Sequence, residues 1–213
     1  MSAALEFQRV LVPVAVMLVT VSGCGGSHHS GPSGTVSVDA DGRIGMLRVD
    51  VSDRRAVVSF AGRPDAERRG RNTVASPFGS ARYDALGYDC VSKVSAKSYA
   101  IPLTDRGPYC HTVFFMRGGR LGLFYTTQAR YVERHGVHVG MATATAERLL
   151  QRRVIVGCLS SIELTRPGRT PLLRFVFDGG TITHMRLPHL RGGHVAALVL
   201  HSAKHDPGVF ECE

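Results

Sequence analysis

The sequence lacks several features that would point to a particular chemistry. It contains no tryptophan, three lysines, and no two cysteines separated by two residues, so a zinc site built on a Cys-x-x-Cys pair is not expected. Gly-x-Ser-x-Gly, glycine-rich phosphate loops and His-Glu-x-x-His are also absent, so the motifs give no hydrolase nucleophile, nucleotide site or catalytic zinc. The apolar run at residues 10–21 is shorter than the ~20 residues that a membrane-spanning helix requires.

This apolar run instead fits the core of a secretory signal, which is typically about 7–15 residues long. It is followed by Val21-Ser22-Gly23-Cys24, which resembles a bacterial lipobox. The resemblance implies removal of residues 1–23 as a signal peptide and attachment of a diacylglyceryl group to the sulfur of Cys24. Since two acyl chains give stable anchoring, we expect a lipid-anchored protein on the extracytoplasmic face of the cell membrane. An ordinary secretory signal and an uncleaved short anchor remain alternatives.

The segment after this cysteine, residues 24–42, is rich in glycine and serine and has no apolar periodicity, which predicts a flexible tether. The chain has a net charge of +9, and nearly all of its cations are arginine. A basic exported protein is attracted to anionic lipid headgroups or anionic wall polymers. Nucleic acid is not expected as a partner, because the signal directs the chain out of the cytoplasm.

Four cysteines follow the tether: Cys90, Cys110, Cys158 and Cys212. An even number of cysteines in an exported chain favours disulfides, here two. Four cysteines allow three pairings, and we favour the sequence-local one, Cys90–Cys110 with Cys158–Cys212. The second bridge would hold the C-terminus, which otherwise tends to fray.

The remaining sequence alternates between helical and strand-like segments. Residues 53–61 predict a short helix, capped by Asp50 or Ser52 and ended by Gly62. Gly118-Gly119 between two aromatic-rich runs predicts a hairpin turn. Residues 143–153 predict a second helix, capped by Thr143. Strands are expected at 82–90, 111–119, 120–128, 158–166, 170–180, 181–187 and 194–202.

The two halves of the chain therefore show a similar order of elements. Each has a lead-in, Ile44-Gly45-Met46 or Val139-Gly140-Met141, followed by a helix, a cysteine and several strands. This order predicts an α+β fold of two tandem modules, residues 43–130 and 131–213. Each module is expected to pack a short helix on one face of an antiparallel β-sheet, leaving the other face solvated or available for a partner.

Two groups of proteins share parts of this pattern. The stretch Val139-Gly140-Met141 to Glu147 resembles the helix entry of the BamE/SmpA-type outer-membrane assembly lipoproteins and the secreted β-lactamase inhibitory proteins. The strands Ala85-Leu86-Gly87-Tyr88-Asp89-Cys90 and Tyr109-Cys110-His111-Thr112-Val113 resemble segments of uncharacterised exported actinobacterial lipoproteins. The first resemblance implies a helix-plus-sheet repeat, and the second implies no activity.

Histidines are the remaining candidates for a catalytic or metal site. His135 and His138 lie three residues apart, and others gather later in the chain: His184, His189, His194, His201 and His205. Metal binding needs several histidine nitrogens to converge, and this spacing does not require it. The sequence thus predicts no metal ion, no cofactor and no catalytic residue, and a metal-dependent enzyme is a third hypothesis.

A contact face is the functional feature that the sequence favours. Arginine and tyrosine are enriched at interface hot spots, and both are frequent in the first half of the chain. The candidate residues are Arg68, Arg69, Arg71, Tyr88, Tyr99 and Tyr109. We expect a non-enzymatic binding or scaffolding lipoprotein whose partner is a protein or an anionic envelope component. The alternative is an inhibitor of a secreted hydrolase, a β-lactamase or a protease, by analogy with the inhibitory proteins.

Overall fold

The computed structural model describes the chain in eight stretches: residues 34–70, 83–95, 98–104, 106–156, 160–164, 172–179, 181–182 and 190–202. The predicted signal, residues 24–33 of the predicted tether (with Cys24), Arg71, Cys158 and Cys212 lie outside these stretches. The prediction that the tether extends to residue 42 is wrong, because Val36–Asp39 form the strand β1, in which Val36 and Val38 are buried. No helix in these stretches is both long enough and apolar enough to cross a membrane.

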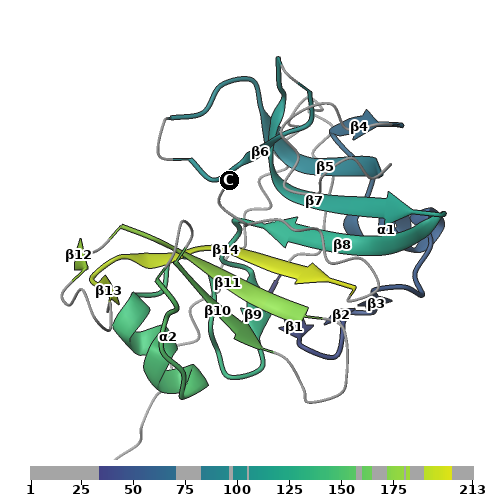
Figure 1. Ribbon diagram of the computed structural model, residues 1–213. Helices are drawn as coiled ribbons and strands as arrows, with labels where there is room; N and C mark the ends of the chain where they lie inside the picture. The colour runs from purple at the N-terminus through teal and green to yellow at the C-terminus, as the bar shows by residue number, and fades with distance from the viewer. Residues whose placement is uncertain are drawn as a thin grey trace, which may run out of the picture.

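An antiparallel sheet of eight strands dominates the molecule (Figure 1). Seven strands follow one another across the sheet in the order β4-β5-β7-β8-β14-β11-β10, and β6 pairs with β7 outside this path. Their bounds are β4 Ala66–Arg68, β5 Asp84–Val91, β6 Ile101–Pro102, β7 Tyr109–Arg117, β8 Arg120–Thr126, β10 Ser160–Leu164, β11 Leu172–Asp178 and β14 His194–His201. The predicted strands at 82–90, 111–119, 120–128 and 194–202 are confirmed with ends shifted by one or two residues. Those at 158–166 and 170–180 are confirmed over the residues that the structure describes.

The predicted turn at Gly118-Gly119 joins β7 to β8. Both glycines have positive φ, 56° and 78°, which is the backbone that a tight two-residue hairpin turn requires. The hairpin pairs Arg117 with Arg120 beside the turn and Thr112 with Thr126 at its far end. The start of the predicted strand at 181–187 is confirmed as β12, Thr181–Ile182, which pairs with β13, Leu190–Arg191. Residues 183–187 lie outside the described residues.

A smaller sheet has the order β3-β2-β1-β9, with bounds β1 Val36–Asp39, β2 Arg43–Ile44, β3 Leu47–Arg48 and β9 Tyr131–Glu133. Strands β1 and β9 are parallel, which places Val36 opposite Tyr131. This pairing joins the first described strand to the second half of the chain. Ile44 ends β2 and Gly45-Met46 form the turn to β3, whereas Val139-Gly140-Met141 lies just before Ala142, the N-cap residue of the second helix. The two matched tripeptides therefore have different structural roles.

Two short helices occur where the sequence predicts them, although their caps differ. Helix α1, Arg54–Ala61, is capped by Asp53, whose carboxylate accepts from the Ala56 N–H at 2.8 Å, rather than by Asp50 or Ser52. Helix α2, Thr143–Leu150, ends three residues earlier than predicted. Its cap position is Ala142 without a side-chain hydrogen bond, and Thr143 is buried.

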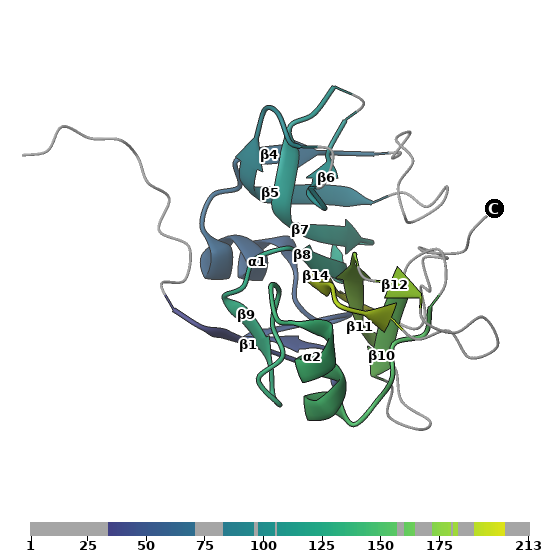
Figure 2. The same ribbon diagram turned by 90° about the vertical axis from the view of Figure 1, so that its left-hand side faces the viewer.

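The structure departs from the prediction of two modules that each have their own sheet. Strands of both halves join in one sheet, because β14 pairs with β8 from Leu198↔Thr126 to His201↔Leu123. Both helices and the smaller sheet pack on one face of it and share a single apolar core (Figure 2). Phe114, Phe124 and Phe175 are completely buried at the centre of this core. The α+β composition and the antiparallel large sheet are confirmed, and the chain has one core on this face rather than two.

The opposite face of the large sheet is also buried, and the prediction that it is open is wrong. Its apolar side chains Phe115, Leu123, Val176, Ala197 and Val199 are at most 2% exposed. Part of the cover comes from the segment between β5 and β7, where Tyr99, Ile101 and Leu103 pack against these strands. A partner therefore has no exposed apolar sheet face to bind in these strands.

Candidate functional site

Among the described residues of the predicted contact face, Tyr88 lies in the core instead of on the surface. Tyr88 is 6% exposed in the main core, its ring meets Phe114 edge-on, and its hydroxyl donates to the Gly62 carbonyl at 3.1 Å. Burial, together with the nearby Glu67 carboxylate, raises its pKa well above the usual value. Tyr88 therefore serves packing and is not available for contact with a partner.

The other contact candidates lie around the segment between β5 and β7. Arg68 donates from Nη1 to the Leu103 carbonyl at 2.8 Å, and Arg69 is exposed beside it. Tyr99 is half-buried, and its carbonyl accepts from the Tyr125 hydroxyl. Tyr109 is half-buried at the start of β7, and Arg71 lies outside the described residues. Arg68 thus holds this segment in place rather than pointing freely to solvent.

The predicted bridge Cys90–Cys110 is confirmed. The two cysteines are opposite each other on β5 and β7, and the bridge closes the segment that covers the second face of the sheet. The bridge packs over Gly87, where an added Cβ would meet the Cys110 Sγ at 2.5 Å and the Leu103 Cδ1 at 2.7 Å. The proposed Cys158–Cys212 bridge lies outside the described residues.

The histidines show no convergence within the part of the chain that the structure describes. The His135 Nδ1 lies 2.8 Å from the buried Glu133 carboxylate, whereas the His138 Nδ1 lies 2.9 Å from the Val139 carbonyl. No group of three histidine, cysteine or acidic side chains in the described residues could hold a metal ion. His184, His189 and His205 lie outside those residues.

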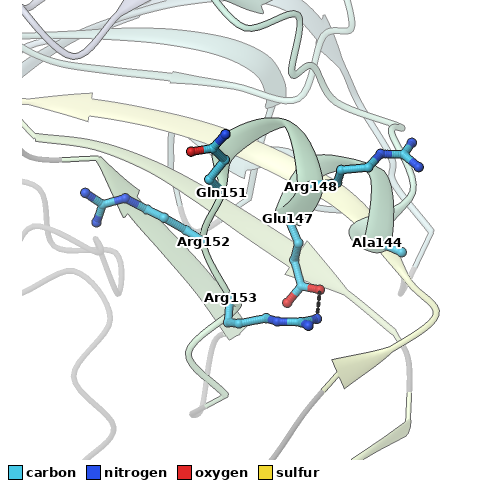
Figure 3. Close-up of a pocket in the computed structure, with 6 residues that line it drawn as sticks. All are labelled: Ala144, Glu147, Arg148, Gln151, Arg152 and Arg153. Atoms are coloured by element: carbon cyan, nitrogen blue, oxygen red, sulfur yellow. Dashed lines mark hydrogen bonds and ion pairs between the residues drawn. The ribbon is translucent and has the colours of Figure 1, made fainter.

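A groove lined by arginine lies along the C-terminal half of α2. It has a volume of about 310 Å³, and we call it the arginine groove; its lining residues are Ala144, Glu147, Arg148, Gln151, Arg152 and Arg153 (Figure 3). A second hollow of about 370 Å³ shares Arg152 and Arg153 and continues past Ile155, Ile162 and Glu163 at the edge strand β10. The two hollows together run from the helix to the edge of the large sheet.

The entry to α2 is fixed by backbone hydrogen bonds to the beginning of β14. The Gly140 N–H donates to the Val195 carbonyl at 2.8 Å, and the Val195 N–H donates to the Met141 carbonyl at 2.8 Å. The Thr143 N–H then donates to the Gly193 carbonyl at 3.1 Å. On its inner side the helix buries Ala146 and Leu150 in the main core. These contacts leave its outer side, which carries Arg148, facing solvent.

Glu147 positions the chain that leaves the helix. The helix ends at Leu150, and the following residue, Gln151, adopts the left-handed conformation with φ 52° and ψ 38°. The Glu147 carboxylate accepts from the Val154 N–H at 2.9 Å and from the Arg153 Nη1 at 3.1 Å. The Arg152 Nη1 donates to the Glu163 carbonyl of β10 at 3.2 Å. Glu147 is thus a structural carboxylate, occupied by two donors, and is poorly suited to acid–base catalysis.

The charge of the arginine groove is predominantly positive. Arg148, Arg152 and Arg153 are all exposed, and the Arg153 side chain has 77% of its surface free, whereas the single carboxylate, Glu147, is 12% exposed. Figure 3 shows Glu147 reaching toward Arg153, with Arg152 and Arg148 directed to different sides of the helix end. Cations near a helix C-terminus also stabilise the helix, so part of this arrangement serves the fold.

The groove escaped the sequence prediction because its arginines fell within an expected helix. Residues 143–153 are read from the sequence as one amphipathic helix, in which Arg152 and Arg153 would continue its polar side. The helix in fact stops before them, and the chain turns toward β10. A signal was present in the pair Arg152-Arg153 four residues after Arg148, the densest positive charge in the second half of the described chain.

Comparison with known proteins gives little guidance about function. No protein-family model matches the chain, and no curated protein matches it. Among solved structures, the uncharacterized protein yfeY from Escherichia coli is similar at a TM-score of 0.45 and 12% sequence identity. The match covers 78% of this chain and 99% of that one.

Proposed function

We propose that this protein is a non-enzymatic, lipid-anchored binding module outside the cytoplasm, and that the arginine groove is its binding site for an anionic envelope component. The observation that supports it most directly is the presence of three exposed arginines around one structurally occupied carboxylate. A guanidinium group presents several N–H donors in a planar fork that matches carboxylates and phosphates. An anionic ligand is therefore the class that this surface fits best.

The groove is suited to binding because its backbone is held by contacts that do not use all the guanidinium donors. Glu147 fixes the segment after the helix through the Val154 N–H, and Arg152 fixes it to β10 with one of its five donors. The Arg148 side chain is exposed on the last turn of the helix. Such preorganisation reduces the entropy that is lost when a ligand binds.

Binding to the isolated cell envelope tests this proposal. The full chain with Cys24→Ser removes the lipid contribution, and the groove variant Arg148→Gln/Arg152→Gln/Arg153→Gln removes three charges from the site. A control variant, Arg63→Gln/Arg69→Gln/Arg106→Gln, removes three exposed charges near β4 and β6. We expect salt-sensitive envelope binding that the groove variant loses and the control variant keeps. Loss in the control variant alone would support the contact face around Arg69 and contradict the groove.

We also propose that the chain arose by duplication, with residues 43–130 and 131–213 as the two repeats. In each half a helix precedes a run of antiparallel strands, which ends at β8 in the first half and β14 in the second. The last strands of the two halves, β8 and β14, pair with each other. Outward from this pair, each half continues with its earlier strands in reverse order: β7, β5 and β4 in the first half, and β11 and β10 in the second. Because the repeats share one sheet, we expect neither half to fold alone, as circular dichroism of the separate halves would show.

A further inference from the structure

The arginine groove adjoins an exposed apolar side chain that the fold does not use. Ile155 is 68% exposed, although its backbone pairs with Ser161 of β10 in both directions, at 2.8 and 3.0 Å. It lines the second hollow beside Arg152 and Arg153. An exposed isoleucine beside arginines suits a protein that rests on an anionic bilayer, because the apolar group can enter the interface while the cations meet phosphates.

The groove lies at the same end of the molecule as the strand that follows the tether. Strand β1 pairs with β9, and α2 follows β9 along the chain. In both Figure 1 and Figure 2, β1, β9, α2 and β10 lie in the lower half, whereas β4, β5 and β6 lie in the upper half. A tether that reaches β1 from a membrane therefore brings this end, rather than the β4–β6 end, toward the bilayer.

The length of the tether limits how far the folded part can move away. Residues 25–35 separate Cys24 from β1. At about 3.4 Å per residue, this segment spans at most about 40 Å when fully extended, comparable to the width of a small domain. A surface that is held this close to a membrane meets headgroups at high effective concentration, so weak attraction is sufficient to orient it.

We infer that the arginine groove and Ile155 form a membrane-docking surface that binds anionic phospholipid headgroups and orients the anchored protein on the bilayer. This inference rests on the proposed function and names the anionic component as the lipid bilayer itself. In the docked protein Arg148, Arg152 and Arg153 contact lipid phosphates, and Ile155 enters the interfacial region. The β4–β6 end, with the Cys90–Cys110 bridge and Arg69, then faces away from the membrane.

Vesicle binding by the full chain with Cys24→Ser tests the surface without the lipid anchor. The probes are vesicles of phosphatidylcholine alone and of phosphatidylcholine mixed with phosphatidylglycerol. Each arginine near an anionic surface strengthens binding by about fivefold, so the groove variant should bind the anionic vesicles roughly a hundredfold more weakly. The control variant at Arg63, Arg69 and Arg106 should bind as the parent does. Equal loss in both variants, or equal binding to both kinds of vesicle, would overturn the inference.

A fluorescence measurement tests the apolar contact independently of charge. Because the chain has no tryptophan, Ile155→Trp gives a single reporter. We expect its emission to shift to the blue on anionic vesicles, and the emission of Val91→Trp, a 40%-exposed position on β5, to stay unchanged. Unchanged emission from both variants would contradict insertion. Envelope binding without vesicle binding would leave the proposed function standing and refute the bilayer as its partner.

Discussion

The Cys90–Cys110 bridge makes a stability contribution that can be calculated from the structure. It joins residues 20 positions apart, and closing a loop of that length in the unfolded chain contributes about 3 kcal/mol. The same bridge holds the segment in which Tyr99, Ile101 and Leu103 cover the second face of the sheet. We therefore expect Cys90→Ala/Cys110→Ala to lose at least this amount of unfolding free energy.

The assay is urea denaturation of the parent and of this variant, both without reductant, so that any bridge between Cys158 and Cys212 is the same in each. Linear extrapolation to zero urea gives the free energy of unfolding of each protein, and we expect the two values to differ by about 3 kcal/mol or more. In thermal unfolding of a chain of this size, the same difference corresponds to a fall of roughly 6–12 °C in the melting temperature. If the variant loses less than about 1 kcal/mol of unfolding free energy, the bridge neither restricts the unfolded chain nor holds the segment between β5 and β7, and this prediction is wrong.

Gly87 supplies a second test of the same contact. In the parent, Gly87→Ala places a Cβ 2.5 Å from the Cys110 Sγ, and overpacking of this kind costs typically about 1–3 kcal/mol. In the variant without cysteines the sulfur atoms are gone, and Leu103 can rotate away, so the same substitution should cost much less. Gly122→Ala on β8, where the nearest atom would be 3.4 Å away, is the control that should be mild in both backgrounds. Equal costs of Gly87→Ala in both backgrounds would show that the sulfur is not what excludes a side chain.

Three further predictions concern other parts of the fold. Burial raises the pKa of the Tyr125 hydroxyl far above its usual value. The folded state therefore keeps this proton when the unfolded state loses it, so the contribution of Tyr125 to stability is complete below about pH 10 and falls at higher pH by about 1.4 kcal/mol per pH unit. Tyr125→Phe should make the free energy of unfolding fall less steeply with alkaline pH, and an unchanged pH dependence would contradict this. Asp53→Ala removes the cap of α1 and should cost about 1 kcal/mol in thermal unfolding, whereas a cost near zero would show that the cap is unimportant. Glu147→Ala frees the Val154 N–H and should speed amide exchange there, while an unchanged rate would refute its positioning role.

Local signals in the sequence predicted most of the elements and one disulfide. The turn at Gly118-Gly119 is specified by residues that tolerate positive φ, and the strands around it by the aromatic-rich runs on both sides of the turn. The bridge Cys90–Cys110 followed from the parity of cysteines and their nearness in sequence. The turn and its strands depend on residues only a few positions apart, and the bridge depends on the chemistry of cysteine. Both kinds of information can be taken from the sequence alone.

Long-range pairing was the part that the sequence did not reveal. The contact between β8 and β14 joins Thr126 to Leu198, residues that no local pattern connects, so two modules were expected where one sheet exists. Tyr88 was expected on a surface because tyrosine is common at interfaces, but its ring is placed in the core by its neighbour Phe114. The arginine groove depends on where α2 ends, and the segment after this end is held on β10 by the hydrogen bond from Arg152 to the Glu163 carbonyl, which no local pattern indicates.

Whether Cys24 carries a lipid is the central question, because the anchor underlies both the proposed function and the membrane orientation. Mass spectrometry of the mature N-terminal peptide from the envelope fraction would determine it. We expect a peptide that begins at Cys24 and has a diacylglyceryl group on its sulfur. A mature chain that retains residues 1–23, or that begins elsewhere with an unmodified cysteine, would contradict this expectation.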